Sequence, residues 1–556
     1  MKKHTVLTLI LLLLASATGL SQDPDVIVTN ARIETMDSRY PEATAMAIKN
    51  GRITKLGSDQ EIRALAGKKT VEVGAHGSYV MPGFTDSHAH FQGVGNSQRI
   101  VRLNGTQSFE EVIKLVQKEA KTRPAGEWIT GRGWDQNLWS SKEFPEHDAL
   151  SNAVPNHPVA LRRVDGHALL TNKKAMDLAG MVRTTAAPAG GEIIRKENGE
   201  PTGVLIDKAM VLINEVVPTT DKATKRADML AAQKLALSLG ITSFHDQGTD
   251  RRDIELLDEL YASGDLKLRL YVMLGVSDIR QTKLATVIPP RVGDHNGKLT
   301  VRGLKIYADG ALGSRGAAMI SDYADRIGHQ GLLLTRQAAF KEMSRIALER
   351  GYQICVHAIG DRGNRMVLDT WADLFPKFPQ VADPRFRIEH AQILHQDDIP
   401  RFASLGVIAS MQAVHCTSDM AWVVARVTQG RAEVGAYAWR SLLDAGAVIC
   451  NGTDSPVEAL TPFAGLYASV TRMNAKGLPK GGWFGDQCMT RREALYSYTK
   501  AGAYASFNEN SLGSLAPGKL ADFILVDTNL RTCPPKELLK AKVRATYING
   551  VCVYGR

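Results

Sequence analysis

The sequence predicts an α/β fold: a distorted (β/α)8 TIM barrel with a small composite β-sandwich domain and an insertion near the barrel mouth. Three observations lead to this prediction. Eight short apolar stretches in the middle of the chain alternate, for the most part, with helical patterns, as in a parallel barrel. Both ends of the chain are instead rich in short strand patterns. One stretch after the first barrel strand is too long for a single crossover connection.

Residues 1–22 have the pattern of a cleavable secretory signal peptide. Lys2 and Lys3 precede the apolar run V-L-T-L-I-L-L-L-L-A, and small residues follow it. The run is too short to span a bilayer comfortably. We therefore expect an exported protein, periplasmic or secreted, with no stable membrane span once the signal is removed. An uncleaved membrane anchor is the alternative.

Residues 23–81 and 511–556 are predicted to form one β-sandwich domain from both ends of the chain. A-M-A-I-K-N-G-R-I-T-K-L-G near the start and A-T-Y-I-N-G-V-C-V-Y-G near the end both have the order strand, Asn-Gly turn, strand. Asn-Gly between apolar runs is a strong signal for a two-residue hairpin. The two ends are therefore expected to assemble into a single small domain.

Residues 82–510 are predicted to form the barrel. Its strands are expected at 81–88, 240–246, 268–274, 301–310, 352–360, 385–392, 406–412 and 446–454. Residues from about 125 to 220 do not fit the alternation of strand and helix, and they include W-I-T-G-R-G-W-D-Q-N and A-A-P-A-G-G-E. We predict that this segment is an insertion over one mouth of the barrel.

Composition excludes several classes of protein. The net charge of +10 is spread without a long Lys/Arg run or a nucleic-acid-binding motif, so we expect no nucleic-acid partner. The chain has 6 cysteines and no C-x-x-C pair, which argues against a thiolate zinc site or a redox motif. Whether any disulfide forms is left open, as is a homodimer.

Two histidines one residue apart end the first predicted strand, in P-G-F-T-D-S-H-A-H-F. Side chains alternate along a strand, so His88 and His90 point to the same side. Imidazole is the commonest metal ligand among side chains, and the two rings could share one ion. The structural alternative is that they satisfy buried hydrogen bonds.

Polar groups also stand near the ends of four later strands. They are Lys305, His357, His390 and Asp454. Because the carboxyl ends of barrel strands share one rim, where ligands and catalytic groups project, we expect these side chains to meet the two histidines in one site.

This order of residues resembles the metal-dependent amidohydrolase superfamily. The finer phrases resemble its YtcJ-like branch, amidohydrolase family 3, which includes N-substituted formamide deformylases. They are G-F-T-D-S-H-A-H, K-I-Y-A-D-G-A-L-G-S-R, V-H-A-I-G-D, R-I-E-H-A-Q, N-G-T-D-S-P-V and L-G-S-L-A-P-G-K-L-A-D-F. The resemblance covers nearly all of the mature chain and is specific for the family, though not for a substrate.

The resemblance implies a centre of two divalent metal ions. His88 and His90 would bind one ion, and His357 and His390 the second. Lys305, carboxylated by CO2, would bridge the two; the structural alternative is a buried lysine paired with Asp309 or another carboxylate. Asp454 would bind the first ion and contact the nucleophilic water. Nitrogen and oxygen ligands without thiolate suit zinc, with manganese, iron and nickel as alternatives.

The implied activity is hydrolysis of a non-peptide C–N bond, an amide, in a small molecule. A metal-bound hydroxide would attack the carbonyl, and Asp454 would act as general base and then general acid. His167, Arg315 and His415 are candidates for binding the substrate. In the family phrase a proline often follows Met-Gln, whereas Ala413 stands here.

Other activities remain open at this point. A deaminase or a cyclic-amide hydrolase could use the same barrel, and a deaminase often needs one metal and no lysine ligand. A hydrolase of N-acyl amino acids would use Arg315 to bind the carboxylate. A metal-binding barrel without turnover is the non-enzymatic alternative.

Overall fold

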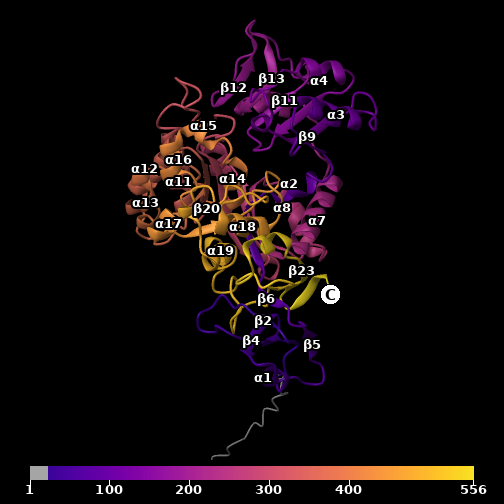
Figure 1. Ribbon diagram of the computed structural model, residues 1–556, viewed down its shortest axis with the longest axis vertical. Helices are drawn as coiled ribbons and strands as arrows, with labels where there is room; N and C mark the ends of the chain where they lie inside the picture. Colours follow the sequence, from indigo (N-terminus) through magenta and orange to yellow (C-terminus); the bar gives the residue numbers. More distant parts are fainter. Residues whose placement is uncertain (1–22, 556) are drawn as a thin grey trace, which may run out of the picture.

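Eight parallel strands form a nearly closed barrel at the centre of the molecule, as the sequence predicts (Figure 1). The computed structural model describes residues 23–555, so the predicted signal peptide lies outside the described residues. The barrel strands are neighbours in chain order. They are β7 (Phe84–Ala89), β14 (Ile241–Thr249), β15 (Arg269–Gly275), β17 (Leu299–Tyr307), β18 (Gln353–Ala358), β19 (Arg387–His390), β20 (Ile408–Met411) and β21 (Ile449–Asn451).

Helices cover the outside of the barrel, so its strands are buried on both faces. Every residue of β18, β19 and β20 is buried, as expected for parallel strands that are covered on both faces. The helices are α2 (Phe91–Asn96), α7 (Lys222–Ser238), α8 (Asp253–Ala262), α9 (Ile279–Ala285), α11 (Gln337–Arg350), α12 (Asp361–Leu374), α13 (Ile399–Ser404), α14 (Ala413–Asp419), α15 (Val423–Val427), α16 (Gln429–Gly435), α17 (Trp439–Asp444), α18 (Pro462–Thr471), α19 (Arg491–Ser497) and α20 (Lys500–Ala505).

The last barrel strand meets the first through contacts just beyond the end of β21. The backbone N–H of Asp454 donates to the His88 carbonyl at 2.6 Å. Thr453 donates from its backbone and its hydroxyl to the carboxylate of Asp86, at 3.0 and 2.7 Å. Gly452 permits this approach, because a Cβ there would lie 2.4 Å from the His88 nitrogen. The seam of the barrel therefore fixes Asp454 beside His88.

Two sheets built from residues 26–82 and 523–555 pack against each other at one end of the molecule (Figure 1). The first contains β1 (Val26–Thr29), β3 (Ala45–Lys49), β4 (Arg52–Gly57) and β5 (Val71–Gly74), and helix α1 (Asp59–Arg63) lies beside it. The second contains β2 (Arg32–Ile33), β6 (Tyr79–Pro82), β22 (Phe523–Val526), β23 (Val543–Ile548) and β24 (Val551–Gly555). Ile48, Val80, Phe523 and Tyr547 share one core, so both ends of the chain stabilise this unit.

The two predicted Asn-Gly turns are present and lie together. Asn50 and Gly51 connect β3 to β4, and Asn549 and Gly550 connect β23 to β24; all four have positive φ, as a type I′ hairpin turn requires. A Cβ at Gly51 would lie 2.9 Å from that of Asn549. Turn conformation and close packing therefore both require glycine at position 51.

A buried ion pair joins the sandwich to the base of the barrel. Arg269, on β15, binds Asp522 through Nε at 2.6 Å and Nη2 at 2.9 Å. Both side chains are almost fully buried. Asp522 also accepts the backbone N–H of Asn549 at 2.9 Å. The pair therefore links the barrel to the C-terminal hairpin.

Asp522→Leu is expected to reduce the free energy of unfolding by about 3–5 kcal/mol, because it leaves the Arg269 guanidinium buried without its carboxylate. Denaturant unfolding of the purified protein measures this. Arg269→Met combined with Asp522→Leu removes both charges and should recover much of the loss. Equal stability of Asp522→Leu and the unsubstituted protein would show that the pair does not hold the two parts together.

The insertion forms a separate layer at the opposite end of the barrel (Figure 1). Its sheet has the order β12-β13-β11-β10-β9-β8. The strands are β8 (Val101–Arg102), β9 (Ile129–Trp134), β10 (Val159–Arg163), β11 (Ala168–Thr171), β12 (Gly191–Arg195) and β13 (Pro201–Asp207), with helices α3 (Phe109–Ala120), α4 (Asp148–Ala153) and α5 (Lys173–Leu178).

The insertion begins earlier than the predicted boundary near residue 125. Strand β8 pairs in parallel with β9, at Val101 opposite Gly131, and α3 packs its apolar side into the same core through Val112 and Val116. The two-residue β8 is too short to produce a periodic pattern, and α3 alone resembles an ordinary barrel helix. Within the described residues, no helix is long and apolar enough to cross a membrane.

Candidate metal centre and active site

All six predicted metal ligands line one cavity of about 540 Å³ at the barrel rim nearest the insertion. His88 lies on β7, Lys305 on β17 and His357 on β18, while His390 is the last residue of β19. His90 follows β7 directly, and Asp454 stands three residues beyond β21. The closure of the barrel therefore brings together side chains that are widely separated in the sequence.

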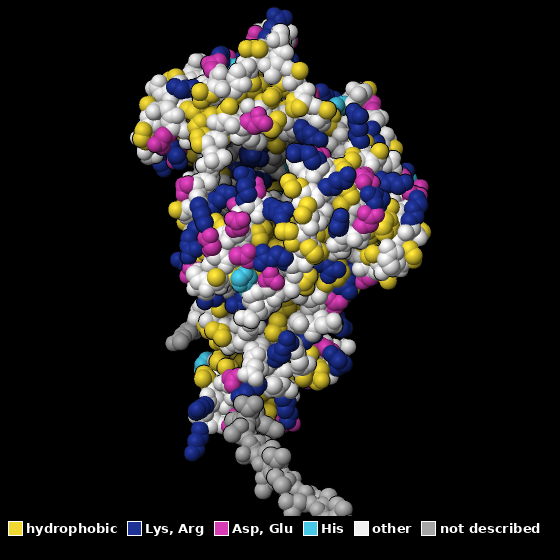
Figure 2. Space-filling view, turned by 180° about the vertical axis from the view of Figure 1, so that it is seen from behind, with side chains coloured by type: hydrophobic (Ala, Val, Ile, Leu, Met, Phe, Trp, Pro, Cys, Tyr) yellow, Lys and Arg dark blue, Asp and Glu magenta, His cyan; other side chains and the backbone are white. Residues whose placement is uncertain are grey.

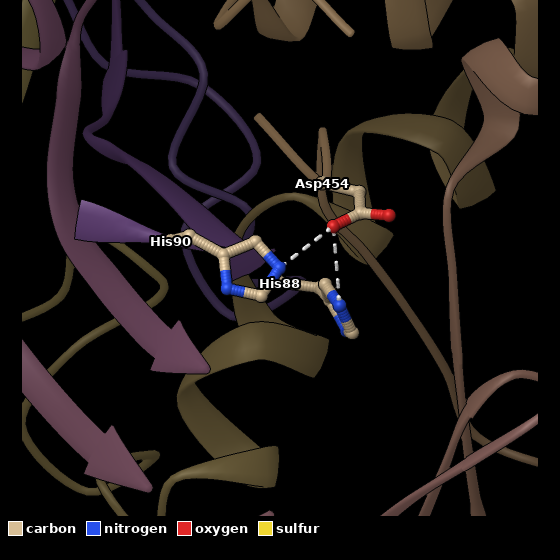
Figure 3. Close-up of side chains that lie close together, drawn as sticks. All are labelled: His88, His90 and Asp454. Atoms are coloured by element: carbon tan, nitrogen blue, oxygen red, sulfur yellow. Dashed lines mark ion pairs between the residues drawn. The ribbon is translucent and has the colours of Figure 1, made fainter. Parts of the chain in front are cut away.

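His88, His90 and Asp454 converge on one point (Figure 3). The Nε2 atoms of His90 and His88 lie 3.2 and 3.5 Å from the same carboxylate oxygen, Oδ1 of Asp454. The other ring nitrogens are engaged: Nδ1 of His88 lies 2.6 Å from Glu389, and Nδ1 of His90 lies 2.9 Å from the Gln247 carbonyl. With Nδ1–H donating to these oxygens, each Nε2 presents a lone pair.

This arrangement fits a cation. Nε2 of His88 and Oδ1 of Asp454 are buried and have no hydrogen-bond partner among the described residues. Buried polar atoms without partners carry a desolvation cost of about 1–3 kcal/mol each. Here two electron-pair donors also face each other. A divalent ion between the imidazoles and the carboxylate would satisfy all three groups, so these residues fit a metal ion.

His357 and His390 form a second pair of imidazoles, with ring centroids 4.6 Å apart. Nε2 of His357 lies 3.3 Å from the Gly310 carbonyl, and Nδ1 of His390 lies 2.6 Å from the side-chain oxygen of Gln412. These bonds leave Nδ1 of His357 and Nε2 of His390 as lone-pair donors. Burial and neighbouring cationic groups hold the pKa of both rings well below the usual value, which favours the neutral form that binds metals.

Two of the predicted ligands have an unusual backbone conformation, with positive φ. His390 has φ of 74° and Asp454 has φ of 53°, in the left-handed region that non-glycine residues rarely adopt. Such conformations persist where the surrounding structure holds them, and they are concentrated at functional sites. The bond from the Asp454 N–H to the His88 carbonyl is part of that support.

Lys305 opens into the same cavity, and within the described residues its ammonium group forms no ion pair. Its side chain is buried, and its Nζ lies 5.1 Å from the centre of the Tyr307 ring. Burial lowers its pKa. The alternative pairing with Asp309 is not found. Asp309 instead accepts the backbone N–H groups of Ala318, Ile359 and Gly360 at 2.8–3.0 Å.

Glu389 contacts the predicted ligand His88, and the sequence pattern did not indicate it. Its carboxylate binds Nδ1 of His88 at 2.6 Å and Nε of Arg387 at 2.9 Å, and all three side chains are fully buried. Burial would raise the pKa of Glu389, but Arg387 and His88 hold it well below the usual value. A carboxylate that fixes the tautomer and orientation of a ligating histidine is a common support of metal sites.

Glu389→Gln is expected to weaken metal binding by about tenfold to a hundredfold, because the amide replaces the charged acceptor of the His88 N–H. Titration of metal-stripped protein with a competing chelator measures the change. Glu342→Gln, on the exposed face of α11, is a matched control that should bind metal normally. An unchanged affinity in Glu389→Gln would rule out this supporting role.

Burial would raise the pKa of Asp454, but His88, His415 and His90 hold it well below the usual value. Its second oxygen, Oδ2, lies 3.3 Å from Nε2 of His415, on α14, whose Nδ1 is 3.6 Å from Glu458. Burial alone would lower the pKa of His415, but bonds to these two carboxylates raise it to about 10. His415 therefore places a positive charge beside the second oxygen of Asp454.

The local backbone also explains the departure from the family phrase at Ala413. Its N–H donates to the side-chain oxygen of Asn451 at 2.9 Å. Proline has no N–H and could not make this bond. The start of α14, and with it His415, is thereby tied to the end of β21.

His167 reaches the centre from the insertion. Its Nδ1 lies 2.6 Å from Asp207, and its ring centroid is 4.8 Å from that of His357. Burial would lower its pKa, but the Asp207 carboxylate raises it. His167 lines both the large cavity and an adjoining one of about 350 Å³, which His415 also lines. Two of the three predicted substrate residues thus lie at the centre.

Arg315, the third, does not lie at the centre, so this geometry gives its predicted role in binding substrate no support. It lines neither of these cavities. Its guanidinium binds Asp325 at 3.0 Å, and Arg426 binds the same carboxylate. The G-S-R-G loop turns at Arg315, which has φ of 60°, and directs the side chain into this surface network.

Comparison with known proteins identifies the family of this chain. A sequence profile described as the amidohydrolase family matches residues 71–554. The protein LONG AFTER FAR-RED 3 of Arabidopsis thaliana is 34% identical, over 95% of this chain and 91% of its own length. YtcJ of Bacillus subtilis, described as an amidohydrolase, is 29% identical over 94% of this chain and 98% of its own.

Two further similarities bear on the chemistry. The N-substituted formamide deformylase of Arthrobacter pascens is 26% identical over 97% of this chain and 99% of its own. The crystal structure of a metal-dependent hydrolase from Pyrococcus horikoshii has 27% identity and a TM-score of 0.73, over 92% of this chain and 99% of that one. The chain is therefore a hydrolase acting on carbon–nitrogen bonds and belongs to the amidohydrolase family, in its YtcJ-like branch.

Proposed function

We propose that this protein hydrolyses a non-peptide amide bond of a small molecule at a centre of two divalent ions. The observation that carries the proposal is the pair of buried, partnerless donor atoms, His88 Nε2 and Asp454 Oδ1, within a rim that also presents Lys305, His357 and His390. The similarity to a formamide deformylase supports an amide substrate.

In this proposal His88, His90 and Asp454 hold one ion, and His357 and His390 hold the other. Zinc suits this set of nitrogen and oxygen ligands, which contains no thiolate. Lys305 is proposed to carry CO2 as a carbamate that would bridge the ions, since it is buried in the same cavity and pairs with no carboxylate of the described residues. When bound, the ions supply Lewis acidity, which polarises a carbonyl and makes water a stronger acid.

Asp454 is the proposed proton carrier. Its Oδ1 faces His88 and His90, whereas Oδ2 faces His415, so one carboxylate can hold an ion and still face the cavity. It would accept a proton from the attacking water and pass it to the departing nitrogen. The two ring nitrogens of His415 face Asp454 and Glu458, and its Nε2–H would donate to the substrate carbonyl in place of the Asp454 oxygen. The products are a carboxylic acid and an amine.

Elemental analysis of the purified protein, followed by assays on N-formyl, N-acetyl and cyclic amides, tests the proposal. We expect two divalent ions per chain and release of amine from at least one class. A single ion beside an unmodified Lys305, with ammonia released from an amino-substituted ring, would favour a deaminase. Two bound ions without hydrolysis of any amide or ester would favour the non-enzymatic alternative, a metal-binding barrel without turnover.

We also propose that the protein is exported, on the pattern of residues 1–22. Lys2, Lys3 and the following apolar run support a cleavable signal. Sequencing the N-terminus of the protein made in its own host should give a start between about Ser16 and Asp25. Recovery of Met1 on protein in the cytosol would refute export.

A further inference from the structure

The insertion contributes three cationic side chains to the large cavity beside the metal centre. Arg132 comes from β9, Arg162 from β10, and Lys208 directly follows β13. In the described part of the chain, none of the three forms an ion pair. Figure 2 shows Lys and Arg side chains around the hollow between the upper lobe and the barrel.

Their hydrogen bonds go only to neutral acceptors. Arg132 donates from Nε and Nη2 to the Val164 carbonyl, at 3.3 and 3.1 Å. Arg162 donates from Nη2 to the side-chain oxygen of Asn214 at 3.1 Å. Because a guanidinium carries five N–H donors, both arginines retain donors that no carboxylate of the described chain occupies.

The two arginines nevertheless remain charged. Burial lowers the pKa of Arg132 to about 10, and burial also lowers that of Arg162. Arg132 lines the same cavity as Asp454, and the negative charge of Asp454 favours the charged form of Arg132. Partly buried charge without a partner is costly, and proteins retain it where a ligand supplies the opposite charge.

The acidic groups of the same cavity have other partners. Asp165 binds Arg163, Asp207 binds His167, and Asp454 faces the imidazoles.

The backbone at Gly166 leaves room for the side chain of Arg132. Gly166 has φ of 79°, and a Cβ there would lie 2.9 Å from Nη2 of Arg132.

The adjoining cavity differs from the first, because its cationic groups face carboxylates of the chain. It is lined by Asp135, Asp419 and Glu458, and the buried cation there, Arg163, is neutralised by Asp135 and Asp165. The two cavities meet at His167, His357, His390 and Asp454. An elongated substrate that places its amide at the centre would therefore meet cations without a carboxylate partner on one side, whereas on the other side Asp135 and Glu458 already face Arg163 and His415.

We propose that the substrate carries a carboxylate, which Arg132 and Arg162 bind while the amide lies at the metal centre. This inference rests on the proposed function and names the substrate class: amides bearing a carboxylate. The planar guanidinium fork matches a carboxylate through paired hydrogen bonds. Lys208, at the exposed edge of the cavity, adds attraction for an approaching anion.

Pairs of substrates that differ only in the carboxylate test whether the enzyme prefers a negatively charged substrate. The metal-loaded protein is assayed on both enantiomers of N-acetylphenylalanine and N-formylphenylalanine, and on the corresponding primary amides, which lack the carboxylate. We expect the acids to have kcat/KM values at least about tenfold higher. Arg162→Gln should raise KM for the acids by about tenfold to a hundredfold with little change in kcat, and should not affect the neutral amides.

Two further variants separate binding from folding. Arg162→Lys keeps the charge and should restore part of the affinity for the acids. Arg183→Gln removes an exposed arginine of the same insertion that lines neither cavity, and should behave as the unsubstituted protein. Equal kcat/KM for acids and neutral amides, or an equal loss on both in Arg162→Gln, would overturn the carboxylate subsite.

Calorimetry makes the test independent of turnover. Metal-loaded Asp454→Asn protein is titrated with N-acetylphenylalanine, with and without Arg162→Gln. Weaker binding of the acid in the double variant supports the subsite, and equal binding overturns it. Failure of the unsubstituted protein to hydrolyse any amide would refute the proposed function, whereas the calorimetry would still decide whether the arginines bind an anion.

Discussion

Asp454→Asn is expected to reduce kcat by about a hundredfold to ten-thousandfold, the range attributed to a positioned acid–base group. The amide has the shape of the carboxylate but cannot accept the proton of the attacking water or return one to the leaving nitrogen. Amine release under saturating substrate measures kcat, and the assay uses whichever amide the unsubstituted protein turns over best.

Measuring the metal content of Asp454→Asn distinguishes a loss of acid–base catalysis from a loss of bound metal. His88 and His90 remain to bind the first ion, and an amide oxygen can still face it, so Asp454→Asn loaded with excess metal should still bind both ions. Asp444→Asn, on an exposed position at the end of α17, is a control that should keep full activity. Normal kcat in Asp454→Asn would remove Asp454 from the mechanism.

Lys305→Met is expected to remove one of the two ions and to reduce turnover by at least about a hundredfold, since loss of a direct ligand should exceed the loss from a supporting residue. Methionine has similar length and tolerates a buried position, so the barrel should fold. Elemental analysis gives the ion count. Mass spectrometry of the unsubstituted protein under native conditions tests for an added CO2.

The outcome distinguishes two roles of the lysine. If Lys305 bridges the ions as a carbamate, Lys305→Met loses metal and activity together, and stripping CO2 from the unsubstituted protein has the same effect. If Lys305 is only a buried amine, Lys305→Met keeps both ions and most of its turnover, and that result would contradict the two-ion centre with a lysine bridge.

Much of the centre could be predicted because the carboxyl ends of all strands in a parallel barrel lie at the same rim. Residues that end successive strands in the sequence therefore lie close together in the fold. The eight barrel strands lie where apolar stretches predicted them, and their carboxyl ends bring His88, Lys305 and His390 into one cavity. The rule needs only strand positions and the hydrophobic pattern, both of which are local properties of the sequence.

Features that depend on pairing across the barrel could not be predicted in this way. Glu389 stands beside His390 in R-I-E-H, but its contact with His88 joins residues 301 positions apart. Arg315 looked suitable for a substrate carboxylate because no local pattern reveals its pairing with Asp325. Arg132 lies in a segment whose fold could not be predicted.

The boundary of the insertion was missed for a related reason. Strand β8 contains only Val101 and Arg102 and is defined by its pairing with β9. Helix α3 has a clear apolar face through Val112 and Val116, but periodicity does not say which sheet a helix covers. A sequence pattern therefore predicts that a strand or helix forms more readily than it predicts which strand or sheet that element packs against.

The most direct measurement of the central claim is anomalous diffraction from crystals of the metal-loaded protein, recorded at the absorption edge of the bound metal. The account predicts one peak within bonding distance of His88, His90 and Asp454, a second at His357 and His390, and Lys305 between them as a carbamate. Saturated crystals without a peak beside Asp454, or with metal only elsewhere on the chain, would contradict it.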